Sequence, residues 1–179
     1  MVDETGVQGV QDVQTVTADG RRLDPLPVGV VVRELVTHTD ERGTVCELYD
    51  PRWGIHPDPL VFAYVFTIRP GAAKGWGIHR RHDDRYAFLN GELELVLYDE
   101  RAGVETSGLV TRLFLSGRHR TLVTIPTGVW HAERNIGQDD VMVVNFPTIQ
   151  YDHTSPDKYR LPLDTDLLPV DLGPGWHGW

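Results

Sequence analysis

Between residues 28 and 147, short runs of β-branched and aromatic residues alternate with clusters of Gly, Pro and Asp. This pattern is typical of strands that are separated by turns. Apolar residues do not recur at helical spacing over several turns anywhere in this stretch. The predicted strands cover residues 30–36, 44–49, 60–69, 85–89, 92–98, 110–115, 120–125, 130–135 and 140–147. Strands at spacings of roughly ten residues predict an all-β barrel or sandwich.

The segment from Glu92 to Tyr98 is the clearest of these strands, because its polar and apolar residues alternate with a period of two. Asn90 and Gly91 precede it, and both residue types tolerate positive φ. The sequence therefore predicts a hairpin turn immediately before this strand.

The first 25 residues differ in composition from the rest of the chain. They contain few large apolar side chains and many Asp, Gln, Thr and Gly residues, which predicts a flexible N-terminal arm over residues 1–25. Residues 26–179 are expected to form a single domain that is long enough to bury a core. Its final part, from Tyr151 onward, is rich in Asp and Pro and is expected to be a short irregular segment.

Charge and cysteine content exclude several classes of protein. The net charge is −9 and the basic residues are scattered, which argues against a nucleic-acid partner. The single cysteine, Cys46, cannot form an intrachain disulfide. No apolar run approaches the ~18 residues of a membrane span, and the N-terminus is polar and acidic, unlike a signal peptide. We therefore expect a cytoplasmic protein without a membrane partner.

Two short segments carry histidines beside turn glycines. In Ile125–Asn135, a Pro-x-Gly turn is followed by His131 and then by an asparagine. In Gly77–Gly91, about 50 residues upstream, His79 follows a glycine by two positions. Both segments resemble the signatures of the cupin barrels. Two histidines from well-separated strands suggest one small pocket inside a β-barrel.

A more specific resemblance covers residues 28–172. Five motifs match, in order, those of the dTDP-4-dehydrorhamnose 3,5-epimerase family; they are Asp40–Glu47, Lys74–His79, Gly91–Arg101, Ile125–His131 and Tyr151–Asp171. The resemblance implies a cupin-type jelly-roll β-barrel that forms a homodimer and uses no metal and no cofactor. It also implies a small-molecule substrate, a 4-keto-6-deoxy hexose linked to a nucleotide, with dTDP expected.

The chemistry of such a substrate explains the residue types. The C4 ketone acidifies the protons at C3 and C5, so a base can remove one of them to give an enolate, and an acid on the opposite face inverts the centre. Histidine suits the role of base because its unperturbed pKa is about 6.5. The resemblance implies that His79 is this base and that Asp164 orients it.

The resemblance also implies a set of substrate-binding residues. Arg42 and Glu47 are expected to face the nucleotide, and His131 the diphosphate or the sugar. Lys74 and Arg85 are candidates for contacts with a phosphate or with the ketone.

Three departures from the family pattern affect the substrate and the acid. Phe66–Ile68 stands where the family has a polar Gln-Asp-Asn run, so an expected substrate contact is lost. Trp76 stands where the family has an arginine, and Asn145 falls on the position of the tyrosine that acts as the acid. Asparagine can hydrogen-bond an enolate but cannot deliver a proton near neutral pH. Tyr151, Tyr86 or Tyr64 could replace it, and we assign the role to Tyr151. We therefore expect a substrate other than the rhamnose precursor and inversion at only one centre.

Three alternatives remain open from the sequence. The first is a metal-dependent cupin enzyme with His79, His82 and His131 as ligands. Its weakness is that residues three apart on an unbroken strand point to opposite faces, and that the usual glutamate is missing. The second is a cupin 3,4-ketoisomerase acting on the same class of sugar. The third is a non-catalytic cupin that binds a sugar nucleotide.

Overall fold

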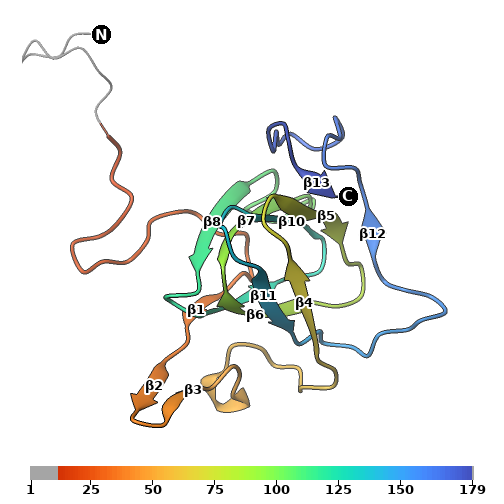
Figure 1. Ribbon diagram of the computed structural model, residues 1–179. Helices are drawn as coiled ribbons and strands as arrows, with labels where there is room; N and C mark the ends of the chain where they lie inside the picture. The colour runs from red at the N-terminus through yellow and green to blue at the C-terminus, as the bar shows by residue number, and fades with distance from the viewer. Residues whose placement is uncertain (1–11, 179) are drawn as a thin grey trace, which may run out of the picture.

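The computed structural model describes residues 12–178 and consists of two facing β-sheets (Figure 1). One sheet has five strands in the order β1-β9-β6-β11-β4, and the other has the order β12-β5-β10-β7-β8 with β13 added beside β5. All pairings within the two sheets are antiparallel except that of β13 with β5. The expected all-β, cupin-type jelly-roll barrel is confirmed.

The strands of the five-stranded sheet are β1 (Val32–Glu34), β4 (Tyr64–Ile68), β6 (Asp84–Asn90), β9 (Thr121–Ile125) and β11 (Val141–Asn145). Those of the second sheet are β5 (Ala72–Ile78), β7 (Glu92–Asp99), β8 (Val110–Ser116), β10 (Val129–Asn135), β12 (Tyr159–Arg160) and β13 (His177–Gly178). A separate hairpin consists of β2 (Thr37–Asp40) and β3 (Gly43–Cys46). Within residues 12–178 the sole helical element is the 3-10 turn η1 (Pro51–Trp53).

The strand β5 is the most consequential element that the sequence pattern failed to predict. It contains two glycines, which are depleted in strands. A Cβ atom on Gly75 would lie 2.6 Å from the Cα of Ala132 on β10. Glycine is therefore required for the close approach of β5 and β10, and these two strands lead to both of the histidines singled out above.

The core between the sheets follows the predicted two-residue period. On β7, Leu93, Leu95 and Leu97 point into the barrel and are almost fully buried. Val96 points to the outer face of the same sheet, where it belongs to a second apolar cluster with Trp76. A strand with alternating contacts of this kind is pinned in register, because a slip of one residue would exchange its two faces.

Both outer faces of the barrel are covered by irregular chain. The C-terminal segment packs Leu168, Val170 and Leu172 against the outer face of the sheet that contains β5 and β10. On the other sheet, Leu122 packs with Trp53 of η1. These covers bury outward-facing side chains of the central strands, such as Val96 and Leu122, so apolar residues occur on both faces of those strands.

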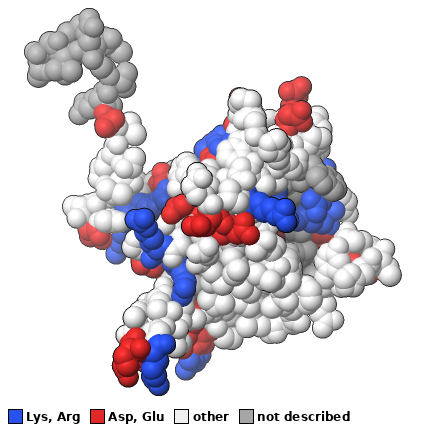
Figure 2. Space-filling view, viewed as in Figure 1, with Lys and Arg blue, Asp and Glu red and all other residues white. Residues whose placement is uncertain are grey.

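The division into an arm and one domain stays a prediction. Residues 1–11 of the expected arm lie outside the described residues. Residues 12–22 lie apart from the sheets and form a local bridge between Val16 and Arg22 (Figure 1). No helix within residues 12–178 is long and apolar enough to cross a membrane. Acidic and basic side chains lie next to one another on the face shown in Figure 2.

Candidate active site

Three histidines and an aspartate meet at one end of the barrel interior. The strand β5 ends at Ile78, and a bend over residues 79–83 carries His79 and His82 before β6 begins at Asp84. His131 enters from β10, where it pairs with Gly77 across the sheet. The ring centroid of His79 lies 4.0 Å from that of His82 and 5.4 Å from that of His131.

The bend after β5 corrects an expectation drawn from the sequence. His79 and His82 do not point to opposite faces, because they do not lie on an unbroken strand. Both rings turn toward Asp84, whose Oδ2 is 3.1 Å from Nε2 of His79 and whose Oδ1 is 3.6 Å from Nε2 of His82. The carboxylate that seemed to be missing is therefore supplied by Asp84.

Asp84 is almost completely buried, at 1% exposure. Asn145 donates a hydrogen bond of 2.7 Å from Nδ2 to its Oδ1, whereas Oδ2 has no hydrogen-bond partner. Burial alone would raise the pKa of Asp84, but the imidazoles of His79 and His82 outweigh this effect and hold that pKa well below its usual range. Asp84 is therefore a buried carboxylate ion.

The two histidines singled out from the sequence differ in their ability to hold a proton. Burial tends to lower the pKa of His79, but the carboxylate of Asp84 outweighs it, so that this pKa lies above its usual value. The pKa of His131 is lowered to about 3 by burial and by the nearby charge of His79. Within the cluster, His79 is the basic group and His131 stays neutral.

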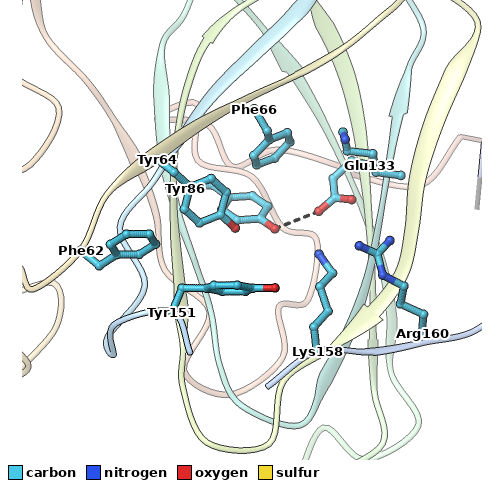
Figure 3. Close-up of a pocket in the computed structure, with 9 residues that line it drawn as sticks. Phe62, Tyr64, Phe66, Tyr86, Glu133, Tyr151, Lys158 and Arg160 are labelled. Carbon is cyan, nitrogen blue, oxygen red and sulfur yellow. Dashed lines mark hydrogen bonds between the residues drawn. The ribbon is translucent and has the colours of Figure 1, made fainter. Parts of the chain in front are cut away.

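A cavity of about 350 Å³ opens beside this cluster. Its lining combines aromatic rings with charged groups, namely Phe62, Tyr64, Phe66, Lys74, Tyr86, Glu133, Tyr151, Lys158 and Arg160 (Figure 3). A smaller hollow of about 40 Å³ adjoins it and reaches His79. Tyr64, Tyr151 and Lys158 line both spaces, so they stand between the cavity and the imidazole.

The cavity wall carries a second buried carboxyl group. Tyr86 donates a hydrogen bond of 3.0 Å to Oε1 of Glu133, and burial raises the pKa of Glu133. In Figure 3, Lys158, which directly precedes β12, points toward Glu133. The cavity therefore offers both donors and acceptors to a polar ligand, and its volume is within the usual range for a small-molecule site.

Some of the residues expected from the sequence are found at this site. Lys74 and Tyr151 line the cavity, and His79 lines the adjoining hollow. His131 lies 3.8 Å from Asp84, measured from Nε2 to Oδ2. Asn145 is fully buried and holds Asp84 and the hydroxyl of Tyr64, so its contacts position other side chains.

The expected partnership between His79 and Asp164 is wrong. Asp164 is exposed and lines a hollow formed by the C-terminal segment itself, together with Leu163 and Asp171. His79 contacts Asp84 through Nε2 and the backbone carbonyl of Asp157 through Nδ1. Asp157 lies beside His79, and the chain that follows it runs outward. Asp164 therefore lies on the outside of the barrel.

The expectation that Arg85 binds substrate is also wrong. Arg85 follows Asp84 on β6, so it points to the outer face of the sheet. It is fully buried there, and its guanidinium donates to the carbonyls of Phe146, Asp58 and Pro59, among others. These bonds tie three loops together and leave the side chain no access to the cavity.

Arg42 and Glu47 do not contribute to the cavity of their own chain. Arg42 is exposed at the turn of the hairpin β2–β3, where it pairs with Asp40, and Glu47 is exposed just after β3. The hairpin projects away from the two sheets (Figure 1).

Five charged residues at the site were not expected from the sequence: Asp84, Glu133, Asp157, Lys158 and Arg160. A signal for Asp84 was present, because it lies two and four residues before the buried Tyr86 and Phe88, and therefore on the same face of β6. Asp157 lies in an irregular segment, where no periodicity indicates the direction of a side chain.

Comparison with known proteins shows the family to which the chain belongs. A family described as "Polysaccharide biosynthesis C-terminal domain" matches residues 38–159. A probable low-salt glycan biosynthesis epimerase, Agl13 of Haloferax volcanii, is 30% identical over 151 residues, which is 83% of this chain and 96% of that protein. The spore coat polysaccharide biosynthesis protein SpsL of Bacillus subtilis is 30% identical over 142 residues, or 78% of this chain and 92% of that protein.

A solved structure shows the same fold. The dTDP sugar isomerase of Desulfovibrio desulfuricans superposes with a TM-score of 0.74 at 24% identity, over 81% of this chain and 91% of that one. The fold and the site together define a cupin with a histidine-lined interior. The chain belongs to the polysaccharide biosynthesis C-terminal domain family, and a probable glycan biosynthesis epimerase is among its relatives.

Proposed function

We propose that this protein is a nucleotide-sugar epimerase that inverts C3, C5 or both centres of a dTDP-linked 4-keto-6-deoxy hexose. One observation carries the proposal: a base, a cation and phenols line two adjoining spaces, with His79 in the smaller one and Lys158, Tyr151 and Tyr64 shared by both. The names of the relatives, an epimerase and a dTDP sugar isomerase, favour this activity over a ketoisomerase or a non-catalytic binding protein.

The first step assigned to the site is removal of a proton from C3 or C5. The electron pair of the C–H bond moves into the carbonyl to give an enolate, and the proton goes to the imidazole of His79. Asp84 lies 3.1 Å from Nε2 and stabilises the imidazolium that forms. The role that the resemblance implied for Asp164 is thereby divided, since the carbonyl of Asp157 holds Nδ1 and orients the ring while Asp84 stabilises its charge.

The second requirement is a positive charge near the enolate oxygen. Lys158 reaches the junction of the two spaces, and Lys74 lines the cavity. An ammonium group in a site that excludes water stabilises a developing oxyanion far more than it would in water. We assign this role to Lys158, with Lys74 directed at the phosphates.

The third requirement is an acid on the opposite face of the sugar. Tyr151 retains this role in the proposal because it lines both spaces and is half exposed, which allows its proton to be replaced from solvent. Tyr64 is the alternative, but its hydroxyl accepts a hydrogen bond from Asn145 and is therefore held by the protein. Donation of the phenolic proton to the carbanion completes the inversion.

The experiment is deuterium exchange into a panel of dTDP-, GDP- and UDP-linked 4-keto-6-deoxy sugars, followed by mass spectrometry and NMR. We expect His79→Ala to lower the exchange rate by about 10²–10⁴-fold, the usual contribution of a general base. His119→Ala serves as the control, because His119 is an exposed histidine far from β5 and β10 in the sheet order. Near-normal exchange in His79→Ala would remove His79 from the mechanism.

A second pair of variants tests the acid. Tyr151→Phe should lower net inversion more than exchange, because the proton can still be removed and returned on one face. Tyr64→Phe should lower the two rates in parallel. If both centres invert at rates that match exchange, and Tyr151→Phe changes neither rate, then Tyr151 is not the acid.

We further propose that the protein works as a homodimer in the cytoplasm. The strand β1 is an edge strand, and exposed Val31 and Val32 lie on or beside it. Arg42 and Glu47 lie on a projecting part of the chain, so they can face a nucleotide only in the cavity of a second copy. A monomer mass that does not change with concentration in light scattering would contradict the dimer.

A further inference from the structure

The wall of the main cavity contains a carboxyl group to which the proposed reaction gives no role. Glu133 lies on β10, two residues after His131 and therefore on the same face of the strand, and it is only 4% exposed. It lines the cavity of about 350 Å³ together with Lys74, Tyr86 and Lys158. Glutamate is rarely buried to this extent, so its position in a space that suits a ligand calls for an explanation.

Tyr86 uses only part of the hydrogen-bonding capacity of Glu133. Its hydroxyl donates one bond of 3.0 Å to Oε1 (Figure 3). An ionised carboxylate offers about four acceptor positions on its two oxygens. Burial raises the pKa of Glu133, whereas the charges of Lys158 and Lys74 and the bond from Tyr86 favour the ionised form. The carboxylate can therefore accept a further hydrogen bond from a ligand in the cavity.

The charges around Glu133 determine which ligand group suits it. Lys74, Lys158 and Arg160 line the same cavity, so an ammonium group of a ligand would lie among three cations. A carboxylate group of a ligand would meet the charge of Glu133 itself, and like charges placed together are costly. A neutral hydroxyl avoids both repulsions. It also donates to a carboxylate more strongly than to a neutral acceptor.

The substrate class has few hydroxyl groups, and at this step the inference rests on the proposed function. In a 4-keto-6-deoxy hexose that is linked through C1 to a diphosphate, C4 carries the ketone, C6 is a methyl group and O5 closes the ring. Only C2 and C3 carry hydroxyls. Inversion at C3 changes the direction of the C3 hydroxyl, whereas the C2 hydroxyl keeps its direction throughout the reaction. An acceptor fixed on a strand therefore suits the C2 hydroxyl.

The pairing of β10 with β5 supports the same choice. Glu133 and Lys74 are directly opposite each other in this register, and residues in that relation are close neighbours. The proposed function directs Lys74 at the phosphates, which are attached to C1. The ring neighbours of C1 are C2 and O5, and O5 has no hydrogen to donate. The C2 hydroxyl is thus the donor nearest to the phosphates.

We propose that Glu133 is a specificity-determining residue that accepts a hydrogen bond from the C2 hydroxyl of the sugar. The protein then selects hexoses that keep this hydroxyl and rejects 2-deoxy sugars, because loss of the donor leaves a buried carboxylate without its partner. Tyr86 is a positioning residue for this contact, since its bond to Oε1 fixes the carboxylate in the cavity wall.

The first test is a binding measurement that does not depend on turnover. Calorimetry compares the affinity of the wild-type protein for dTDP-6-deoxyglucose and for its 2-deoxy counterpart, two stable compounds that differ only at C2. We expect the compound with the C2 hydroxyl to bind at least about 10-fold more tightly, as a hydrogen bond to a charged group implies. Equal affinities overturn the proposal, and so does failure of both compounds to bind.

Variants then assign the discrimination to Glu133. In Glu133→Leu the two affinities should become equal within about 3-fold, because the acceptor is absent. Glu133→Leu combined with Tyr86→Phe repeats the test in a protein where the phenol is not left without its acceptor. Glu105→Leu is the control, because Glu105 is exposed between β7 and β8, and it should discriminate as the wild type does. Circular dichroism verifies folding, and discrimination that persists in the folded Glu133 variants overturns the assignment.

Deuterium exchange into the 4-keto forms of the same two compounds separates the role of Glu133 from the proposed function. We expect kcat/KM to be at least about 100-fold higher for the compound with the C2 hydroxyl, since a site built to bind a hydroxyl strongly rejects the analogue that lacks it. Equal kcat/KM values leave the epimerase proposal standing and overturn the role of Glu133. Discrimination in binding without any exchange leaves the role of Glu133 standing and overturns the epimerase proposal.

Discussion

Two buried aspartates at strand ends show how differently one fold can use the same side chain. Asp84 begins β6 and Asp99 ends β7, and both are almost completely excluded from solvent. Asp99 is fully satisfied: Arg101 donates to it from the backbone and from the guanidinium, at 2.7–3.1 Å, and Thr106 donates at 2.6 Å. The carboxylate of Asp99 therefore fixes the loop that follows β7.

Asp84 has the opposite environment. Asn145 supplies one hydrogen bond, and the other oxygen faces imidazole nitrogens without a hydrogen-bond partner. A buried carboxylate that the protein does not fully hydrogen-bond calls for an explanation, and a functional role is one. The comparison teaches that burial of a charge does not by itself identify a functional site. What distinguishes a functional site is how many hydrogen-bond donors the protein already supplies to the buried charge.

The largest effect that would separate the two aspartates is expected for Asp84→Asn. Its deuterium exchange should fall by about 10²-fold or more, because a neutral amide does not stabilise the imidazolium of His79. Its melting temperature should fall as well, because the imidazoles of His79 and His82 stabilise the charged carboxylate in the folded protein and hold the pKa of Asp84 well below its usual range. Exchange and thermal unfolding are measured on the same samples. Retained exchange together with a large loss of stability would show that Asp84 has a structural role and not a functional one.

Asp99→Asn should show the complementary phenotype. We expect a loss of about 1–3 kcal/mol in the free energy of unfolding, because Arg101 is left without its counter-ion and is only partly exposed. Denaturant unfolding at neutral pH measures this loss. Deuterium exchange by the folded variant should match that of the wild type. A fall in exchange would show that Asp99 contributes to the reaction.

The contribution of Asp99 to the free energy of unfolding should also decrease as the pH falls. Burial tends to raise the pKa of Asp99, but hydrogen bonds from Arg101 and Thr106 outweigh it and lower that pKa. Its contribution to stability is therefore present above the unfolded-state value of about 3.9 and is lost as the pH falls through the folded-state value. The stability gap between wild type and Asp99→Asn should narrow below about pH 4. A gap that is constant from pH 7 to pH 3 would contradict this.

The smallest effect is expected for Thr106→Val. This change removes one donor to Asp99 and one acceptor for the backbone N–H of Val28, while Arg101 remains in place. A loss of about 1–2 kcal/mol follows from two hydrogen bonds of ordinary strength. The measurement is again denaturant unfolding. A loss as large as that of Asp99→Asn would show that Thr106, and not Arg101, is the main partner of the carboxylate.

The sequence alone predicted the architecture well because its signals are local. Alternation along β7 and the turn before it depend on neighbouring residues only, and the structure has them as expected. The same holds for β10, which carries His131 into the barrel. The strand β5 was missed because its glycines serve a contact with β10, which lies more than fifty residues away along the chain.

Only the tertiary structure decided which groups meet His79. Asp84 and Asp157 arrive from a strand start and from an irregular segment, and a resemblance in the C-terminal region pointed to Asp164 instead. Arg85 differs from Asp84 by one position in the chain, yet it lies on the other face of the sheet. Local patterns determine strands and their faces, whereas bends and long-range pairing determine where a side chain points once a strand has ended. Such a bend determines the partners of His79, and no periodicity in the sequence predicts the direction of the bend.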